Sequence, residues 1–322
     1  MPESFSLTPF SLNLLILVIV LVINGVISTL SNQQPLQFFQ LYCMQLAKKV
    51  NRTNNGNDQQ TLAGLLALLI TLVPIVIILW LFSDFVAVPP LWRGLLLYLA
   101  VGSLTLGKVT KKVKQALITN QVEQAKQLLT PLLLRNVQPL SISGLSKATI
   151  EMQLLRVTQQ VYVVCFIYLC VGALPALCYR LLLEMHYCWN TKLPRFYYFG
   201  LCCQRCVKLL QWLPSRLIAL LMLLVTPNGN KVVSWRLTRK YFFNLNENFV
   251  LATHALALGI KLGGVAMYEQ HKVQKPSFND QAKQPEPKEI SLAMSMVNFC
   301  LYSSLALLVV VAFCAELFSL PL

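Results

Sequence analysis

Long apolar stretches separated by polar, basic segments dominate the pattern of this chain. A run of about 18 or more apolar residues can cross the roughly 30 Å hydrocarbon core of a bilayer as a helix. On this basis we predict six membrane helices, over residues 10–30, 62–82, 91–106, 161–183, 209–225 and 293–318. The predicted fold class is an all-α polytopic membrane protein with amphipathic helices on its cytoplasmic side.

Three polar segments connect these helices. In the first, 31–61, residues 38–50 predict a short amphipathic helix. The second, 108–160, is predicted as a helical region outside the membrane, because apolar residues recur there three or four positions apart. The third, 227–292, has an aromatic and basic start and a Pro-rich, charged end, and is interpreted as a loop region. The whole chain, 1–322, is expected to form a single membrane domain.

The composition agrees with a membrane protein, because 56% of the residues are hydrophobic and only 12% are charged. Such values exclude an ordinary soluble domain. The balance of 27 Lys and Arg against 12 Asp and Glu could favour nucleic acid, but most of the basic residues lie in the three polar segments. This distribution is a topology signal: the positive-inside rule places the three segments in the cytoplasm and both termini on the other side.

One short segment disagrees with this topology. Residues 186–208 would lie outside, although they carry four basic residues, Lys192, Arg195, Arg205 and Lys208. Either a short basic segment is tolerated there, or residues 196–210 lie in the membrane interface and the helix count is wrong.

The chain is organised around residues 171–221, two apolar runs joined by a polar and aromatic link. The second run contains Arg216, two positions after Pro214. A charge inside a membrane helix is expensive, so Arg216 must face a protein interior, a water-filled cavity or an anionic partner. Pro214 leaves a backbone carbonyl about one turn earlier without its donor, and a guanidinium can bond such a group. Both a structural partner and a ligand stay open for Arg216.

No motif identifies a reaction by itself. A Walker-type G-x-x-x-x-G-K-[ST] is absent, so a P-loop is not predicted. L-G-I-K-L-G-G (258–264) could approach a phosphate or provide close packing. C-C-Q-R-C (202–206), with His186 and Cys188 nearby, offers zinc-type ligands, but its spacing matches no standard zinc pattern. The ten cysteines imply no disulfide framework, and no metal site is predicted.

Several blocks around the central stretch resemble a known family. They read G-A-L-P-A-L-C-Y-R (172–180), R-F-Y-Y-F-G (195–200), W-L-P-S-R-L-I-A-L-L (212–221), A-L-G-I-K-L-G-G-V-A-M-Y (257–268) and V-Q-K-P (273–276). Their order and spacing are similar to those of the CobD/CbiB integral membrane proteins, the adenosylcobinamide-phosphate synthases of cobalamin biosynthesis, whose relatives include the AmpE proteins. The resemblance covers roughly two thirds of the chain and implies a multi-pass protein of the bacterial inner membrane.

The resemblance implies an ATP-dependent amide ligation that joins an aminopropanol phosphate to a carboxylate of the corrin ring. This chain departs from the family at polar positions. The segment after the first membrane helix lacks the family's acid and histidine, and His186 stands where the family has Asp. A family segment rich in Glu, Asn, Asp and Gly is matched here by Leu155, Arg156, Gln159 and Gln160. Magnesium-nucleotide chemistry needs hard oxygen ligands, and most of the candidates are lost.

Two interpretations follow. In the first, the chain is a divergent, non-catalytic protein with AmpE-like binding or signalling and no cofactor. In the alternative it is an active divergent synthase that uses Mg-ATP. Catalytic candidates are Glu151 and Lys275, and candidate ligand-binding residues are Arg216, Lys261, Gly263, Gly264 and Tyr268. Expected partners are the lipid bilayer and either a corrinoid or another membrane or cytoplasmic protein, with no nucleic acid.

Overall fold

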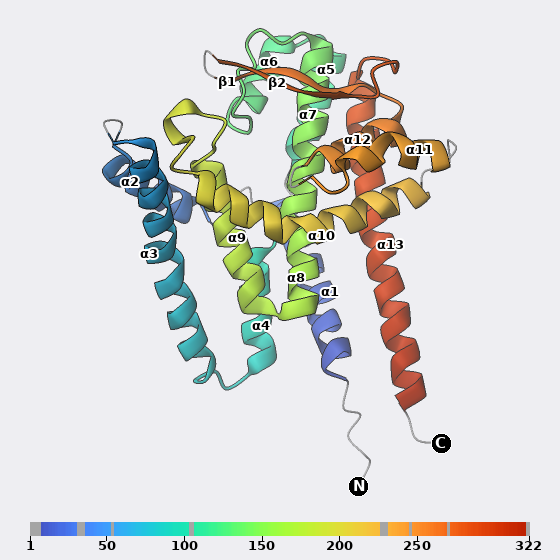
Figure 1. Cartoon of the computed structure of the whole chain (residues 1–322). Helices are drawn as coiled ribbons and strands as arrows, with labels where there is room; N and C mark the ends of the chain where they lie inside the picture. Colours follow the sequence, from blue (N-terminus) through green and yellow to red (C-terminus); the bar gives the residue numbers. More distant parts are fainter. Residues whose placement is uncertain are drawn as a thin grey trace.

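The computed structural model describes residues 8–30, 36–52, 55–102, 106–225, 231–244, 247–268 and 271–319. Within this part of the chain the fold is largely helical, with one two-stranded antiparallel hairpin (Figure 1). Three long helices, α1 (Pro9–Leu30), α3 (Asn57–Ser83) and α13 (Pro287–Ser319), extend toward one end of the molecule.

Shorter elements fill the space between these helices and cover the other end. The α-helices are α2 (Gln37–Val50), α4 (Pro89–Ala100), α5 (Leu106–Ile118), α6 (Val122–Leu129), α7 (Ile142–Val157), α8 (Val163–Val171), α9 (Ala173–Cys188), α10 (Leu201–Val225), α11 (Lys231–Thr238) and α12 (Asn248–Leu258). A π-helical segment, η1 (Thr158–Tyr162), joins α7 to α8, and η2 (Pro194–Phe196) and η3 (Arg239–Tyr241) are short 3-10 turns. The hairpin consists of β1 (Leu262–Tyr268) and β2 (His271–Phe278).

Among the residues that the structure describes, five helical stretches are long and apolar enough to cross a membrane: Pro9–Ser28, Asn57–Ser83, Ile142–Val171, Leu201–Leu224 and Pro287–Glu316. Three of them lie mostly uncovered, with only 28%, 17% and 22% of the most apolar window buried in α1, α3 and α13. Such surfaces suit contact with lipid rather than water. The prediction of a helical, polytopic membrane protein is confirmed, although five candidate spans replace the six expected.

The predicted helix 161–183 is wrong, because the chain reverses at Gly172. This residue has φ 117° and ψ −178°, a conformation that glycine alone adopts readily. α8 ends there and α9 returns along it, while α7, η1 and α8 form one candidate span that begins at Ile142, inside the predicted extramembrane region 108–160. Hydropathy cannot detect this reversal, since the residues on both sides of Gly172 are apolar.

The predicted helix 91–106 is also wrong in length. α4 has 12 residues, which at 1.5 Å per residue span about 18 Å, too short to cross the bilayer. It ends because Val101 turns to extended geometry, and the Gly102 N–H then donates to the Gln160 carbonyl of η1 at 3.0 Å. By contrast, the amphipathic helix predicted over 38–50 is confirmed as α2.

The region 227–292, predicted as a loop, contains α11, α12 and the hairpin. The small-residue stretch 258–264 ends α12 and opens strand β1, with Gly259 in the left-handed conformation at the helix end. The sequence pattern missed these elements because they are short, with 7 to 11 residues each.

All the basic segments gather at one end of the molecule. Figure 1 shows α5, α6 and the hairpin at this end, which we call the polar end. The opposite end holds the outer ends of α1 and α13 and the turn between α3 and α4. The link between α9 and α10 also lies toward the polar end. The discordant basic segment 186–208 therefore shares its side with the other basic segments, which removes the conflict in the sequence-based topology.

α10 runs across the long helices rather than alongside them (Figure 1). One face of α10 packs on the protein through Cys203, Val207, Ile218 and Met222, which are buried. The other face exposes a leucine stripe at helical spacing, Leu209, Leu210, Leu213, Leu217 and Leu224. This pattern and orientation are typical of a helix at the membrane–water boundary, while the stretch Leu201–Leu224 is also long and apolar enough to cross a membrane.

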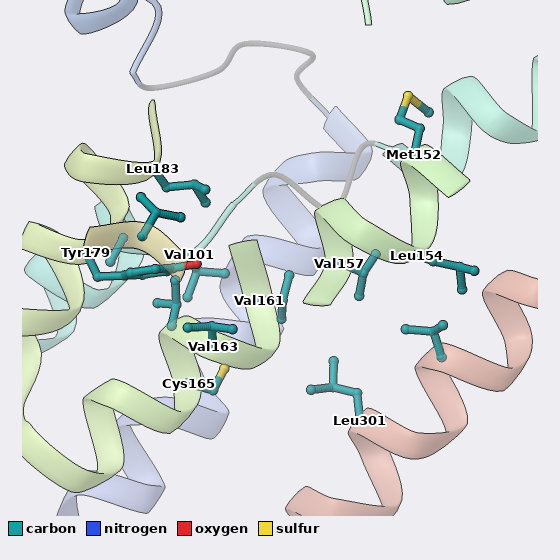
Figure 2. Close-up of a cluster of buried hydrophobic side chains, with 14 of the residues drawn as sticks. Val101, Met152, Leu154, Val157, Val161, Val163, Cys165, Tyr179, Leu183 and Leu301 are labelled. Atoms are coloured by element: carbon teal, nitrogen blue, oxygen red, sulfur yellow. The ribbon is translucent and has the colours of Figure 1, made fainter. Parts of the chain in front are cut away.

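The core lies where the α7–η1–α8 helix meets α9 and α13. Figure 2 shows side chains from all these elements in one cluster, among them Leu154, Val161, Tyr179 and Leu301. The Tyr179 hydroxyl donates to the Gln159 carbonyl at 3.0 Å within this apolar surrounding. This bond fixes α9 against the π-helical segment.

Arg216 connects α10 to the turn that follows η3. Its side chain is only 3% exposed, Nε donates to the Phe242 carbonyl at 3.0 Å, and Nη2 donates to the Asn244 carbonyl. Nη1 donates to Ser215 Oγ at 2.8 Å. The guanidinium thus bonds backbone carbonyls as expected, but they belong to the connection between α11 and α12 and not to the turn before Pro214.

We expect Arg216→Leu to lower the yield of folded protein and its thermal midpoint in detergent. Losing charge-assisted bonds to these part-buried carbonyls should cost on the order of 3 kcal/mol. Arg216→Lys keeps the charge but not the planar arrangement of donors. Its yield and thermal midpoint should lie between those of the wild type and those of Arg216→Leu. Wild-type yield and midpoint in the leucine variant would contradict this role.

The orientation of α10 predicts which side each of its flanks faces. Reporter fusions truncated after Lys192 and after Lys240 should report the same side of the membrane, and a fusion after Asp84 should report the opposite side. Opposite signals from Lys192 and Lys240 would mean that α10 crosses the bilayer.

Candidate functional site

A cavity of about 540 Å³ is lined by residues of α2, α7, η1, α9, the segment after α9 and the hairpin. Among the described residues that line it are seven cationic side chains, Lys48, Arg135, Arg156, Arg180, Lys192, Arg195 and Lys275. Three acidic side chains, Glu151, Glu184 and Glu247, also line it. The excess of positive charge favours an anionic ligand.

The π-helical segment forms part of the cavity wall. Gln159 and Gln160 line the cavity, and the Tyr187 hydroxyl donates to Gln159 Oε1 at 2.7 Å. Gln159 Nε2 donates to Glu247 Oε1 at 2.5 Å. Single π turns inside α-helices occur often at functional sites, and here the turn presents two consecutive amides to a buried polar network.

Glu151 is held from two sides. Its Oε2 lies 3.4 Å from Arg135 Nη1, and its Oε1 accepts a bond from the Gly263 N–H at 2.8 Å. The strand register shifts between Gly263 and Val265, and a Cβ at position 263 would lie 2.1 Å from the Pro276 carbonyl oxygen. Glycine therefore permits the bulge that aims this N–H at Glu151, which links the hairpin to α7.

A second buried pair connects α9 to α2. Arg180 Nη2 lies 2.5 Å from Glu184 Oε1, four residues later on α9, and Gln40 Nε2 donates to Glu184 Oε2 at 2.6 Å. Both partners are nearly inaccessible, with 7% of Arg180 and 1% of Glu184 exposed. Arg180 Nε and Nη1 have no hydrogen-bond partner among the described residues.

His186 lies in the last turn of α9, outside the five candidate spans, and lines the same cavity. Burial lowers its pKa to about 4, with smaller effects in the same direction from Lys192 and Lys208 and an opposing one from Glu247. The imidazole is therefore neutral at pH 7. It follows that the positive charge of the cavity comes from Lys and Arg alone.

The hairpin side of the cavity is built around an aromatic ring. Lys192 Nζ lies 5.9 Å and Lys275 Nζ 5.6 Å from the centre of the Tyr268 ring. Cation–π contacts of this kind contribute about 0.5–1 kcal/mol each at exposed sites. They hold two lysines from different segments at the rim.

The structure brings together only some of the residues singled out in the sequence. Glu151, Tyr268 and Lys275 line the cavity, and Gly263 reaches it through its bond to Glu151. Three others lie elsewhere: Lys261 pairs with Asp280 at 2.9 Å, Gly264 sits in the β1 bulge, and Arg216 bonds the carbonyls described above.

Sequence reasoning missed several polar residues that line the cavity, Arg135, Arg180, Glu184 and Glu247. A signal for one pair was present, because Arg180 and Glu184 stand four positions apart within an apolar run. Opposite charges at this spacing face each other on a helix.

The charges that line the cavity suit an anion better than a magnesium ion. Among the described residues, no group of three or more His, Cys, Asp or Glu side chains is placed to hold a metal. The three cavity carboxylates are each bonded to a cationic or amide side chain already. Mg²⁺ is usually bound through one or two carboxylates besides substrate phosphates, and here each carboxylate is engaged separately.

Comparisons with known proteins identify the family. A family model described as CobD/Cbib protein matches residues 17–297. The cobalamin biosynthesis protein CobD of Chromobacterium violaceum is 32% identical over 203 residues, which cover 63% of this chain and 65% of that protein, slightly less than two thirds of its length. The CobD protein of Stutzerimonas stutzeri is 28% identical over 224 residues, 70% of this chain and 74% of the relative.

A further relative is more distant in sequence. A probable cobalamin biosynthesis protein CobD of Pyrococcus abyssi is 24% identical over 223 residues, 69% of this chain and 71% of that protein. No solved structure matches the chain. Because the family model covers most of the sequence, including the blocks at 172–180 and 212–221 that carry the resemblance, the chain belongs to the CobD/CbiB family.

Proposed function

We propose that this chain is an inner-membrane protein of bacterial cobalamin metabolism that binds a phosphorylated ligand in the cavity beneath the hairpin. We further propose that it does not catalyse the ligation that the family resemblance implies. The observation that carries the proposal is the charge of the cavity, in which seven Lys or Arg face three Glu that are already bonded.

The charge distribution supports an anionic ligand. Cationic side chains approach the cavity from α2, α7, α9, the segment after α9 and the hairpin, so that a ligand inside would be surrounded. Guanidinium and ammonium groups bind phosphate oxygens through short, charge-assisted hydrogen bonds. Positive potential in a low-dielectric cleft also raises the local concentration of anions.

The polar substitutions support a loss of catalysis. Arg156, Gln159 and Gln160, which replace part of the family's acidic segment, all line this cavity. An amide can accept hydrogen bonds, but it supplies no negative charge to balance Mg²⁺. Gln159 is also committed to Tyr187 and Glu247. The remaining function would then be binding or signalling, as in the AmpE branch.

The alternative is an active, divergent adenosylcobinamide-phosphate synthase that uses Mg-ATP. It is favoured by the names of the relatives, which are cobalamin biosynthesis proteins, and by the presence of Glu151 and Lys275 in one cavity. On this alternative both residues would touch the substrates, and the corrinoid would be the partner.

Complementation distinguishes the two. A strain that lacks its own synthase is grown where survival depends on making cobalamin from cobyric acid. We expect no growth from this chain, because the carboxylates needed to hold the metal are replaced or engaged.

The control is the Stutzerimonas relative expressed to the same level in the membrane fraction. Growth restored by this chain, and abolished by Glu151→Ala or Lys275→Ala, would overturn the non-catalytic proposal and make the chain a divergent ligase.

A further inference from the structure

We infer that Arg180 is the phosphate anchor of the cavity, and that phosphate oxygens of the ligand accept hydrogen bonds from Nε and Nη1 of its guanidinium. This inference rests on the proposed function, and it names the group that holds the ligand. It also fixes how the ligand lies, with its phosphate toward α9 and away from the rim formed by Lys192 and Lys275.

The first argument is the state of the guanidinium itself. Arginine is always charged in proteins and carries five N–H donors. In Arg180 only Nη2 is bonded, to Glu184, while Nε and Nη1 are buried and have no partner among the described residues. An unsatisfied buried donor costs about 1–3 kcal/mol, more when it is charged. Ligand oxygens that accept from these two nitrogens remove that cost.

The second argument is preorganisation. Glu184 fixes one side of the guanidinium and is itself fixed by Gln40 of α2. The two unpartnered nitrogens therefore have a set orientation before any ligand arrives. Their charged N–H groups point in fixed directions within the guanidinium plane, a geometry that lysine cannot reproduce.

The third argument is the packing beside Nη1. A Cβ at position 102 would lie 3.2 Å from Arg180 Nη1 and 2.6 Å from Gln160 Oε1, so glycine lets both side chains pack against the backbone where any other residue would displace them. Gln160 lines the cavity beside Arg180 and is bonded to the Tyr187 hydroxyl only at 3.5 Å. Such a long contact lets the amide turn aside when a phosphate approaches.

Pyrophosphate tests the inference on the full-length protein in detergent, with binding measured by calorimetry at constant ionic strength. Arg180→Lys keeps the charge and loses the fork. The double variant Arg180→Gln with Glu184→Gln removes the buried pair without leaving one charge alone, which guards against misfolding. Lys192→Gln is the matched control, since it removes a full charge from the same cavity.

We expect wild-type protein to bind pyrophosphate and both Arg180 variants to bind about tenfold or more weakly, from the loss of charge-assisted bonds. Lys192→Gln should weaken binding less than Arg180→Lys. If the Arg180 variants bind like wild type while Lys192→Gln does not, the anchor is wrong and the anionic cavity stands. If the wild type binds no pyrophosphate, the proposed function itself fails.

The phosphate can come from a soluble ligand or from a lipid headgroup. A second titration, in membranes of defined lipid composition, distinguishes these two sources. The titration is repeated in nanodiscs of phosphatidylcholine and of phosphatidylcholine with phosphatidylglycerol. Unchanged affinity supports a soluble phosphate at Arg180. Weaker pyrophosphate binding in the anionic discs, seen with wild type and absent in Arg180→Lys, supports a headgroup at the same anchor. An equal loss in both proteins would overturn the assignment to Arg180.

Discussion

The rest of the structure depends on how the π-helical segment between α7 and α8 is bonded to its surroundings. In a bilayer, backbone polar groups must find partners inside the protein. The carbonyl of Gln159 accepts from the Tyr179 hydroxyl, and that of Gln160 accepts from the Gly102 N–H. These two bonds place α9 on one side of the segment and the end of α4 on the other. The cavity forms because α9 is held there with Arg180 and Glu184 facing η1 and α2.

Gly172 is the second condition for this arrangement. A continuous helix through residues 161–183 would carry Arg180 and Glu184 away from Gln159 and Gln160. The reversal returns them to the same level, so two segments adjacent in sequence become opposite walls of one cavity. A β-carbon at this position would strain the turn, since φ 117° is poorly tolerated by L residues.

The sequence made the outer helices predictable and concealed the inner ones. α1, α3 and α13 face lipid along most of their length, so their apolar runs are long and unbroken. The inner helices α4, α8 and α9 are apolar as well, but they end where a backbone bond or a glycine dictates, which hydropathy does not record. α10 has the composition of a span, and only its packing shows that it runs across the others.

The functional site, too, was only partly predictable from the sequence. Tyr268 and Lys275 stand in blocks that carry the family resemblance, and the fold brings them together with Glu151 in one cavity. Arg180 was not singled out, because a single arginine at the end of an apolar block attracts less attention than Arg216 in the middle of one. The sequence shows only that Arg180 and Glu184 stand four residues apart. Their burial depends on how α9 folds back along α8, which the sequence pattern did not predict.

The two buried arginines differ in a way that separates structure from binding. Arg216 uses all three of its nitrogen atoms on partners within the protein, two of them backbone carbonyls. Arg180 uses one, and the other two are buried without a partner in the described chain. A buried guanidinium that is satisfied by the fold stabilises the fold, whereas one left partly unsatisfied lowers stability until a ligand supplies the missing acceptors. The ligand-free protein is thus destabilised by the unsatisfied donors of Arg180, and a bound phosphate would remove this destabilisation.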